Sequence, residues 1–228
     1  MPTAIPYCGA PPTPEALPWA PDAGLALALL LILALGWRRS PSRPALLGGV
    51  AVLALALLTP LCALAVALFS ARVGQHLLIL LGAAPLLAVG LRLRAPPVAA
   101  AAAAFAVVLW LWHLPAPYGW TFASPLAWWA MHASLLAAGV ALAQAMWRAP
   151  PEGALAAGLA TAAQMGGLGA FLTFAPRPLF PAHALSTWPW GLTQLEDQQL
   201  GGLLMWVPGG VLFAALALAG VARALREA

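Results

Sequence analysis

The 228-residue chain has very little charge: only 7% of its residues are Asp, Glu, Lys or Arg, and lysine is absent. Soluble domains carry roughly a quarter of their residues as charged side chains, so this composition excludes an ordinary soluble domain. The ten arginines are scattered, and despite a formal net charge of +4 they make no basic run that would favour a nucleic acid. With 63% hydrophobic residues, the composition indicates a membrane protein.

Cysteine is also scarce. Cys8 and Cys62 are too few for a disulfide framework, and their separation is not that of a zinc site. No basic residue precedes the first apolar stretch, so we expect no cleavable signal peptide. What the chain has instead is a series of apolar stretches separated by short polar connections.

These stretches predict the fold class: an all-α integral membrane protein with a bundle of seven transmembrane helices. A spanning helix needs about 20 apolar residues. The stretches cover residues 23–37, 45–69, 72–91, 98–113, 126–147, 153–174 and 198–222. We therefore expect a Pro-rich extracytoplasmic tail at residues 1–22, a membrane domain at 23–222 and a cytoplasmic tail at 223–228. Three prolines inside the stretches predict kinks, namely Pro60, Pro85 and Pro208.

Arginine placement predicts the orientation, because the loops on the cytoplasmic side of membrane proteins are enriched in basic residues. With the N-terminus outside and seven spans, eight arginines fall inside: Arg38, Arg39, Arg43, Arg92, Arg94, Arg148, Arg223 and Arg226. Only Arg72 and Arg177 fall outside. The sequence thus favours an N-out, C-in bundle.

Four histidines are the most informative polar residues, because ionisable groups are costly in hydrocarbon and are usually functional there. At about 1.5 Å of rise per residue, His76 lies roughly 6 Å and His132 roughly 9 Å below the predicted outer boundary. His113 closes the fourth stretch at that boundary, and Met205 lies roughly 10 Å down the seventh. Asp197 opens the seventh helix at its positive N-terminal end.

Imidazole and thioether ligands suit copper, particularly reduced copper. The sequence therefore predicts a copper site in the outer leaflet, with the ligands His76, His113, His132, Asp197 and Met205. Structural roles are the alternative: hydrogen bonds between helices for the histidines, core packing for the methionine and a helix cap for the aspartate. His183 lies in a predicted loop, where we expect it to be solvated.

Four motifs resemble a known family. They are FSARVGQHLLILLGAAPLL at 69–87, WHLPAPY at 112–118, LTFAPRPLFP at 172–181 and DQQLGGLLMWVPGG at 197–210. In this order they are similar to the CtaG family of cytochrome c oxidase assembly factors, in its seven-span, Bacillus-type membrane form. The resemblance covers roughly residues 45–222, and the last motif is the most specific.

The resemblance implies a protein of the bacterial cytoplasmic (inner) membrane that helps to build a haem–copper oxidase, by delivering or protecting copper, and that has no enzymatic turnover. It places His76, His113, His132 and Asp197 at family positions. Two positions depart from the family pattern: Arg72 stands where a second histidine is expected, and Cys62 where an aspartate is expected. We expect Arg72 to pair with Asp197 or Glu196 at the outer surface.

Two other functions are compatible with the sequence. A b-type haem protein of electron transfer would use His76 and His132 as axial ligands. A small-solute or metal transporter would need polar groups near the bilayer midplane, where the candidates are Gln144, Thr161 and Gln164. The expected partners are an oxidase subunit and the lipid bilayer, and the sequence does not define an oligomeric state.

Overall fold

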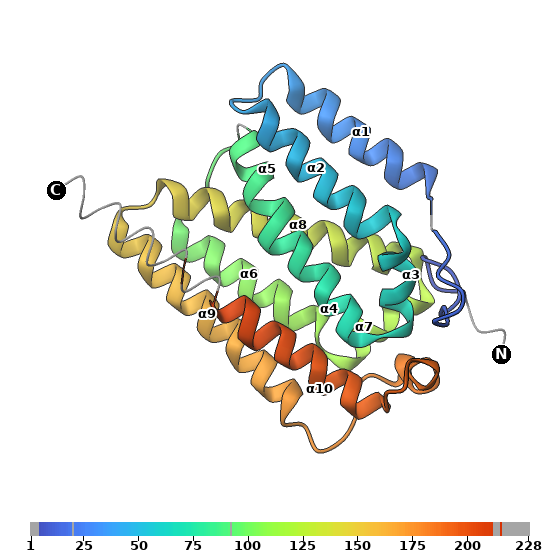
Figure 1. Cartoon of the computed structure of the whole chain (residues 1–228). Coiled ribbons are helices and arrows are strands. Elements are labelled where there is room, and N and C mark those ends of the chain that lie inside the picture. The colour runs from blue at the N-terminus through green and yellow to red at the C-terminus, as the bar shows by residue number, and fades with distance from the viewer. Residues whose placement is uncertain (1–4, 20, 92, 212–214, 216–228) are drawn as a thin grey trace.

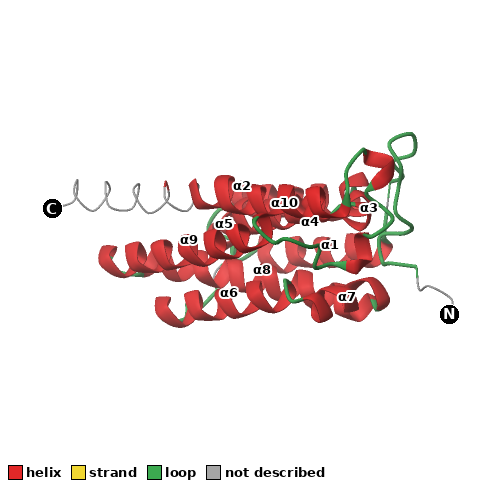
Figure 2. Cartoon of the chain, turned by 90° about the horizontal axis from the view of Figure 1, so that it is seen from below, coloured by secondary structure: helices red, strands yellow, loops and turns green. Residues whose placement is uncertain are grey.

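The structure, a computed structural model, describes residues 5–19, 21–91, 93–211 and 215. Within these residues the chain is helical apart from its connections, and it contains one isolated β-bridge, between Thr13 and Ala16, but no strand. The helices lie side by side along one direction (Figures 1 and 2). This arrangement confirms the all-α prediction.

The first half of the bundle is built from α1 (Ala23–Trp37), α2 (Arg43–Leu58), α3 (Pro60–Ala67), α4 (Phe69–Leu77), the π-helix η1 (Leu78–Ala83) and α5 (Ala84–Gly90). The second half contains α6 (Val98–Trp112), α7 (Pro115–Ala123), α8 (Pro125–Arg148), α9 (Pro151–Thr173), α10 (Gln194–Leu204) and the π-helix η4 (Met205–Gly209). Two short 3-10 helices, η2 (Pro181–His183) and η3 (Trp188–Trp190), lie in the connection between α9 and α10.

Several of these helices are long and apolar enough to cross a membrane. Three continuous helical segments meet this requirement of length and hydropathy: Phe69–Gly90, Pro125–Arg148 and Pro151–Thr173. Two bent pairs, α2 with α3 and α6 with α7, raise the number to five if each pair is one span. Helix α1 is apolar but has only 15 residues, and the stretch predicted at 198–222 extends beyond the described residues. The membrane-helix character is supported, and the count of seven stays a prediction.

The connections fall into two groups at opposite ends of the bundle (Figure 1). The α1–α2, α5–α6 and α8–α9 connections share one end, where Ser40 donates to the carbonyl oxygen of Gly90 and Arg148 to that of Leu93. Five arginines lie in or next to these connections: Arg38, Arg39, Arg43, Arg94 and Arg148. The N-terminal segment, α3, α7 and residues 174–193 lie at the opposite end. This grouping matches the predicted distribution, although Arg92, Arg223 and Arg226 lie outside the described residues.

The three prolines have different effects on their helices. Pro60 starts α3 after a break at Thr59, and the chain bends there by 50°. Pro85 follows η1, and Pro208 lies inside η4. Because proline lacks an N–H and clashes with the carbonyl four residues earlier, a locally wider π-turn accommodates the ring without ending the helix.

One helix was not foreseen. Residues 114–125 were expected to be a connection, but Pro115–Ala123 form α7, which is inclined by 69° to α6. Pro115 occupies the first turn, where its missing N–H costs nothing. The buried Tyr118 and Thr121 turn inward from α7 toward the bundle. This helix therefore forms part of the wall around the buried histidines.

Helices α9 and α10 approach each other closely at two glycines. A Cβ added to Gly202 would lie 2.7 Å from both the carbonyl oxygen of Gly169 and the backbone nitrogen of Thr173. A Cβ on Gly169 would lie 2.8 Å from the carbonyl oxygen of Gly202. Small residues permit such contacts between membrane helices, so this pair sets the position of α10 against α9.

We expect Gly202→Ala to lower the free energy of unfolding by roughly 1–3 kcal/mol, the usual cost of overpacking. Gly167→Ala is the matched control, because no atom lies within 4 Å of the added Cβ. That variant should be neutral or slightly stabilising, since alanine favours helix over glycine. Thermal unfolding in detergent measures both. Equal midpoints for the two variants would contradict the close packing of α9 and α10.

Candidate functional site

The four histidines come from four different elements and all are buried. His76 lies on α4, His132 on α8 and His183 in η2, while His113 is the C-cap of α6. Their exposed fractions are 5%, 5%, 1% and 6% respectively. The helices thus carry all four imidazoles into the interior of one end of the bundle, as the depth argument predicted for three of them.

Three of these imidazoles lie against one another. The ring centroid of His76 is 5.5 Å from that of His132 and 6.3 Å from that of His113, and both contacts are edge to face. His76 is therefore the central member of a group that we call the histidine cluster: His76, His113 and His132. Residues separated in the chain by up to 56 positions meet here, because α4, α8 and the end of α6 bring these side chains to the same end of the bundle.

Two members of the cluster have their ring orientation fixed by backbone carbonyls. Nδ1 of His113 lies 2.7 Å from the carbonyl oxygen of Leu109, and Nδ1 of His132 lies 2.9 Å from that of Trp128. Nδ1 must be the donor in each pair, so in the neutral imidazole the lone pair is on Nε2. This is the arrangement by which proteins orient metal-binding histidines.

His76 differs from both neighbours, because neither of its ring nitrogens has a hydrogen-bond partner. In a neutral imidazole one nitrogen carries a hydrogen and the other a lone pair, and leaving either one buried and unpaired costs about 1–3 kcal/mol. Such an exception calls for an explanation, for example an ion or a water molecule. The donor chemistry of His76 therefore fits a metal ion.

The cluster is not a preformed coordination shell. Among the described residues, no three His, Cys, Asp or Glu side chains are arranged so as to hold a metal ion. The imidazole rings, now in edge-to-face contact, have to rotate before Nε2 of His113 and Nε2 of His132 can both point at one metal ion. Nε2 of His132 lies 3.4 Å from the side-chain oxygen of Gln75; both atoms are acceptors when Nδ1 carries the hydrogen, so this contact is not a hydrogen bond and leaves the lone pair available.

Asp197 has a structural role at another place. Its carboxylate accepts hydrogen bonds from the backbone N–H of Phe69 at 2.6 Å and of Ser70 at 3.1 Å, and from the Ser70 hydroxyl. These donors form the first turn of α4, roughly 9 Å along the helix axis from His76. Asp197 was predicted as a ligand, but it caps α4 from a different helix.

Met205 is buried in the main apolar cluster, together with Met165 and Leu172. It is the first residue of the π-helix η4, which places its thioether in the interior of the bundle. Its role as a ligand stays a prediction.

Arg72 is one turn before His76 on α4, and it is buried with an exposed fraction of 2%. Its Nε donates to the carbonyl oxygen of Ala65, and one Nη donates to the Thr121 hydroxyl at 2.7 Å. The guanidinium also lies 4.3 Å from the ring centroid of Phe122. The expected pair of Arg72 with Asp197 or Glu196 is wrong: the cation turns toward α7 and is stabilised by dipoles and an aromatic face.

His183 is not solvated, as was expected, but is the most buried histidine. Its Nε2 lies 2.7 Å from the hydroxyl oxygen of Tyr118, and its Nδ1 lies 3.1 Å from the carbonyl oxygen of Ala67. Burial, and then the nearby charge of Arg72, lower its pKa from 6.5 to about 3. A loop histidine offers no periodicity from which this burial could be recognised in the sequence.

A disulfide joins Cys8 to Cys62 and fastens the N-terminal segment to α3. Two cysteines were judged too few for a framework, yet they suffice for one staple. Next to Cys8, the ring of Tyr7 stacks on Trp128 with centroids 4.2 Å apart. Trp128 in turn lies 4.0 Å from the ring of His132. The N-terminal segment is thus connected to the histidine cluster by two successive ring contacts.

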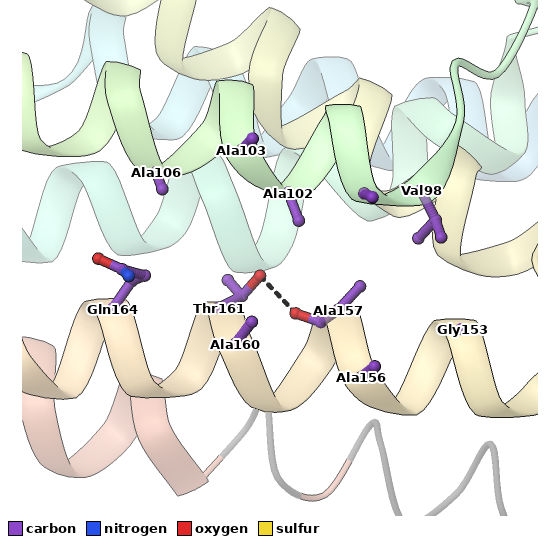
Figure 3. Close-up of a pocket in the computed structure, with 11 residues that line it drawn as sticks. Val98, Ala102, Ala103, Ala106, Gly153, Ala156, Ala157, Ala160, Thr161 and Gln164 are labelled. Carbon is purple, nitrogen blue, oxygen red and sulfur yellow. Dashed lines mark hydrogen bonds between the residues drawn. The ribbon is translucent and has the colours of Figure 1, made fainter.

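A cavity of about 410 Å³ lies elsewhere, between α6 and α9 (Figure 3). Its lining is mostly alanine, with Thr161 and Gln164 as polar members. Thr161 donates to the carbonyl oxygen of Ala157, and Gln164 accepts from the indole of Trp110. Gln144, the third polar residue considered for transport, donates to the carbonyls of Ala88 and Leu91. Each of the three thus makes a structural hydrogen bond.

The comparison with protein families agrees with the resemblance carried by the four motifs. The family model described as cytochrome c oxidase caa3 assembly factor matches residues 26–227, which is most of the chain. No curated protein and no solved structure matches the chain.

The cap on α4 makes a prediction about stability. Asp197→Asn keeps the shape but turns one acceptor oxygen into a donor that faces other donors. We expect a loss of about 2–3 kcal/mol in the free energy of unfolding, because buried N–H groups lose their partner. Glu196→Gln is the control, because Glu196 is exposed and belongs only to the local cap of α10. The idea fails if both variants unfold at the temperature of the wild type.

His183 predicts a pH dependence. The unfolded chain protonates it near 6.5, whereas in the folded protein its pKa is about 3. Its stabilising contribution is therefore complete above pH 6.5 and is lost progressively as the pH falls toward 3. The unfolding midpoint of the wild type should fall more steeply than that of His183→Gln between about pH 6.5 and pH 4. Parallel curves would show that His183 does not resist protonation.

Proposed function

Because the chain belongs to the cytochrome c oxidase caa3 assembly factor family, we propose that it assists the assembly of a haem–copper oxidase by binding copper at the histidine cluster. Copper is the cargo in this proposal, and the protein itself has a non-catalytic role. His76, His113 and His132 supply imidazole nitrogens, and Met205 is a candidate thioether donor. Asp197 contributes by fixing the start of α4 rather than as a ligand.

The observation that carries the proposal is the unpaired imidazole of His76. It is buried between two further imidazoles, and both of its nitrogens lack a partner. A bound ion accepts a lone pair from His76 and from the Nε2 atoms that the carbonyl bonds of Nδ1 leave available. Metal–imidazole bonds of about 2 Å bring ligand nitrogens within roughly 4 Å of one another, which neighbouring rings can reach by turning.

The charge of the site favours a monovalent ion. Arg72 lies one turn from His76, and two unit charges about 6 Å apart repel by roughly 3 kcal/mol at an effective dielectric constant near 20. A divalent ion would double this repulsion. Copper(I) carries a single charge, and soft thioether ligands favour it. The direction of the guanidinium toward Phe122 and Thr121 weakens the repulsion further.

A single ion also suits the cluster better than a haem. A haem with His76 and His132 as axial ligands would place its porphyrin between the two rings. The centroids of these rings are only 5.5 Å apart and in edge-to-face contact, so the macrocycle would have to separate α4 from α8.

We place the histidine cluster toward the outer side of the bacterial cytoplasmic membrane. The Cys8–Cys62 disulfide lies at that end, and disulfides persist in oxidising compartments. Five described arginines lie at the opposite end, as the positive-inside rule expects of the cytoplasmic side. The partner is then an oxidase subunit that receives copper from the outer half of the bilayer.

Copper titration of the purified protein tests the proposal. The wild type should bind copper(I) in competition with a chromogenic chelator, and His76→Leu should weaken this binding at least about tenfold, equivalent to 1.4 kcal/mol. Gln144→Leu is a matched control, because it removes a buried polar group from α8 about 18 Å along the helix from His132. Equal affinities for the wild type and His76→Leu would refute the proposed site.

The same variants test the role in cells. Haem–copper oxidase activity should be low in a strain that lacks this protein, and the wild-type gene or Gln144→Leu should restore it. His76→Leu should restore it only when copper is supplied in excess. Full restoration of oxidase activity by His76→Leu at low copper would show that assembly does not depend on copper binding at His76.

A further inference from the structure

We propose that the N-terminal segment, residues 5–13, is a cover over the histidine cluster, and that an external dithiol releases it by reducing the Cys8–Cys62 disulfide. As a control of copper entry this inference rests on the proposed function. The cover itself is defined by contacts that do not depend on copper.

The cover reaches the cluster through stacked rings. Tyr7 lies on Trp128 with ring centroids 4.2 Å apart and planes inclined by 18°. The edge of Trp129 also contacts the ring of Tyr7, at 5.9 Å. Trp128 lies on His132, and His132 contacts His76. Trp128 is buried and lies between the segment and the cluster, so displacement of Tyr7 uncovers the indole that shields His132.

Few contacts hold the segment in place. Cys8 and Pro12 are its only buried residues between positions 5 and 13. The carbonyl oxygen of Pro12 accepts a hydrogen bond of 3.3 Å from the indole of Trp190. Burial and a hydrogen bond to Asp22 raise the pKa of Tyr7 to about 12, so its hydroxyl stays protonated. Apart from these contacts and the ring contacts of Tyr7, the segment is attached by the covalent bond from Cys8 to α3.

The backbone directs Cys8 into the bundle by a tight turn. The N–H of Gly9 donates to the carbonyl oxygen of Pro6, and Gly9 has a φ of 95°, which only glycine adopts readily. The segment therefore turns inward at Tyr7 and Cys8 and outward again after them. The turn thus directs two neighbouring side chains into the bundle: Cys8, which forms the disulfide, and Tyr7, which stacks on Trp128.

Reduction is a thiol–disulfide exchange with a dithiol as the co-reactant. One thiolate of the reductant attacks the sulfur of Cys8, which is the more exposed of the two at 7% against 1% for Cys62. A mixed disulfide forms at Cys8, and Cys62 leaves as a thiolate that takes up a proton. The second thiol of the reductant then attacks the mixed disulfide. Two electrons and two protons pass to the cysteines, and the reductant becomes a disulfide.

Release of the segment follows from the loop that the disulfide closes. Because α1 and α2 stay folded, the flexible part of the loop runs only from Cys8 to the start of α1 at Ala23, and in the chain-entropy model closing a loop of about 15 residues is worth roughly a hundredfold in the equilibrium against opening. Without it, the ring contacts of Tyr7, its hydrogen bond to Asp22 and the 3.3 Å hydrogen bond to the carbonyl of Pro12 remain. The reduced protein therefore exposes Trp128 and, through it, His132.

Chemical modification of histidine tests the cover without copper. The full-length protein in detergent is treated with diethylpyrocarbonate before and after reduction by dithiothreitol, and the modification rate of each histidine is followed by peptide mass spectrometry. We expect His132 to react at least about tenfold faster after reduction, a part of the loop-closure effect. His183, whose ring nitrogens are held by Tyr118 and Ala67, should not change.

Two variants complete the design. In Cys8→Ser with Cys62→Ser, His132 should react fast with and without dithiothreitol. In Tyr7→Ala, where the disulfide is kept, it should react faster than in the oxidised wild type. An unchanged rate at His132 after complete reduction, checked by thiol titration, overturns the inference. An equal rise at His183 also overturns it, because reduction would then loosen the whole end of the bundle.

Copper uptake separates this inference from the proposed function. After removal of the dithiol, copper(I) should enter the reduced protein faster than the oxidised one. If His132 becomes accessible but neither form binds copper, the proposed function fails and the cover stands. If both forms bind copper equally fast and His132 stays protected, the cover fails and the proposed function stands.

Discussion

The carboxylate of Asp197 fixes the start of α4, and the candidate site depends on that helix. Helix α3 ends and α4 begins at a single extended residue, Leu68, which has no side-chain cap to offer. The N–H groups of Phe69 and Ser70 are therefore bonded from α10, 128 and 127 residues further along the chain. A negative charge at this position also interacts favourably with the positive, N-terminal end of the α4 dipole. Because Arg72 and His76 follow on the same helix, this contact sets where both side chains point.

The rest of the interior follows the rule that polar groups removed from water need partners. Gln75 donates to a carbonyl of α2, Gln144 to two carbonyls near the end of α5, and His183 bridges α7 and α3. Each polar side chain thus joins two parts of the chain. Among the described residues only His76 and the hydroxyl of Thr187 have buried side-chain atoms without a partner. The exception of His76 is informative because its neighbours obey the rule so closely.

Much of the helical architecture could be predicted from hydropathy. The first stretch, 23–37, coincides with α1, and 126–147 differs from α8 by one residue at each end. The meeting of His76, His113 and His132 followed from their predicted depths, all within roughly 9 Å of the outer boundary. Depth gives no direction around a helix axis, however, and so the carboxylate of Asp197 was placed beside the histidines instead of above α4. Helix α7, the buried His183 and the Cys8–Cys62 bond depend on contacts between distant segments, which periodicity does not encode.

The π-helical turn at Leu78–Ala83 separates two halves of one long helix that have different neighbours. Helix α4 packs on α3 and α10, whereas α5 packs on α2 and α8. A π-turn holds one more residue than an α-turn, and one residue corresponds to roughly 100° of rotation. The side chains of α4 can therefore face α3 and α10 while those of α5 face α2 and α8, although the two helices are continuous through the π-turn. The turn thus uncouples the two halves: a substitution that changes the face presented by the half with His76 need not disturb the packing of the half with Pro85.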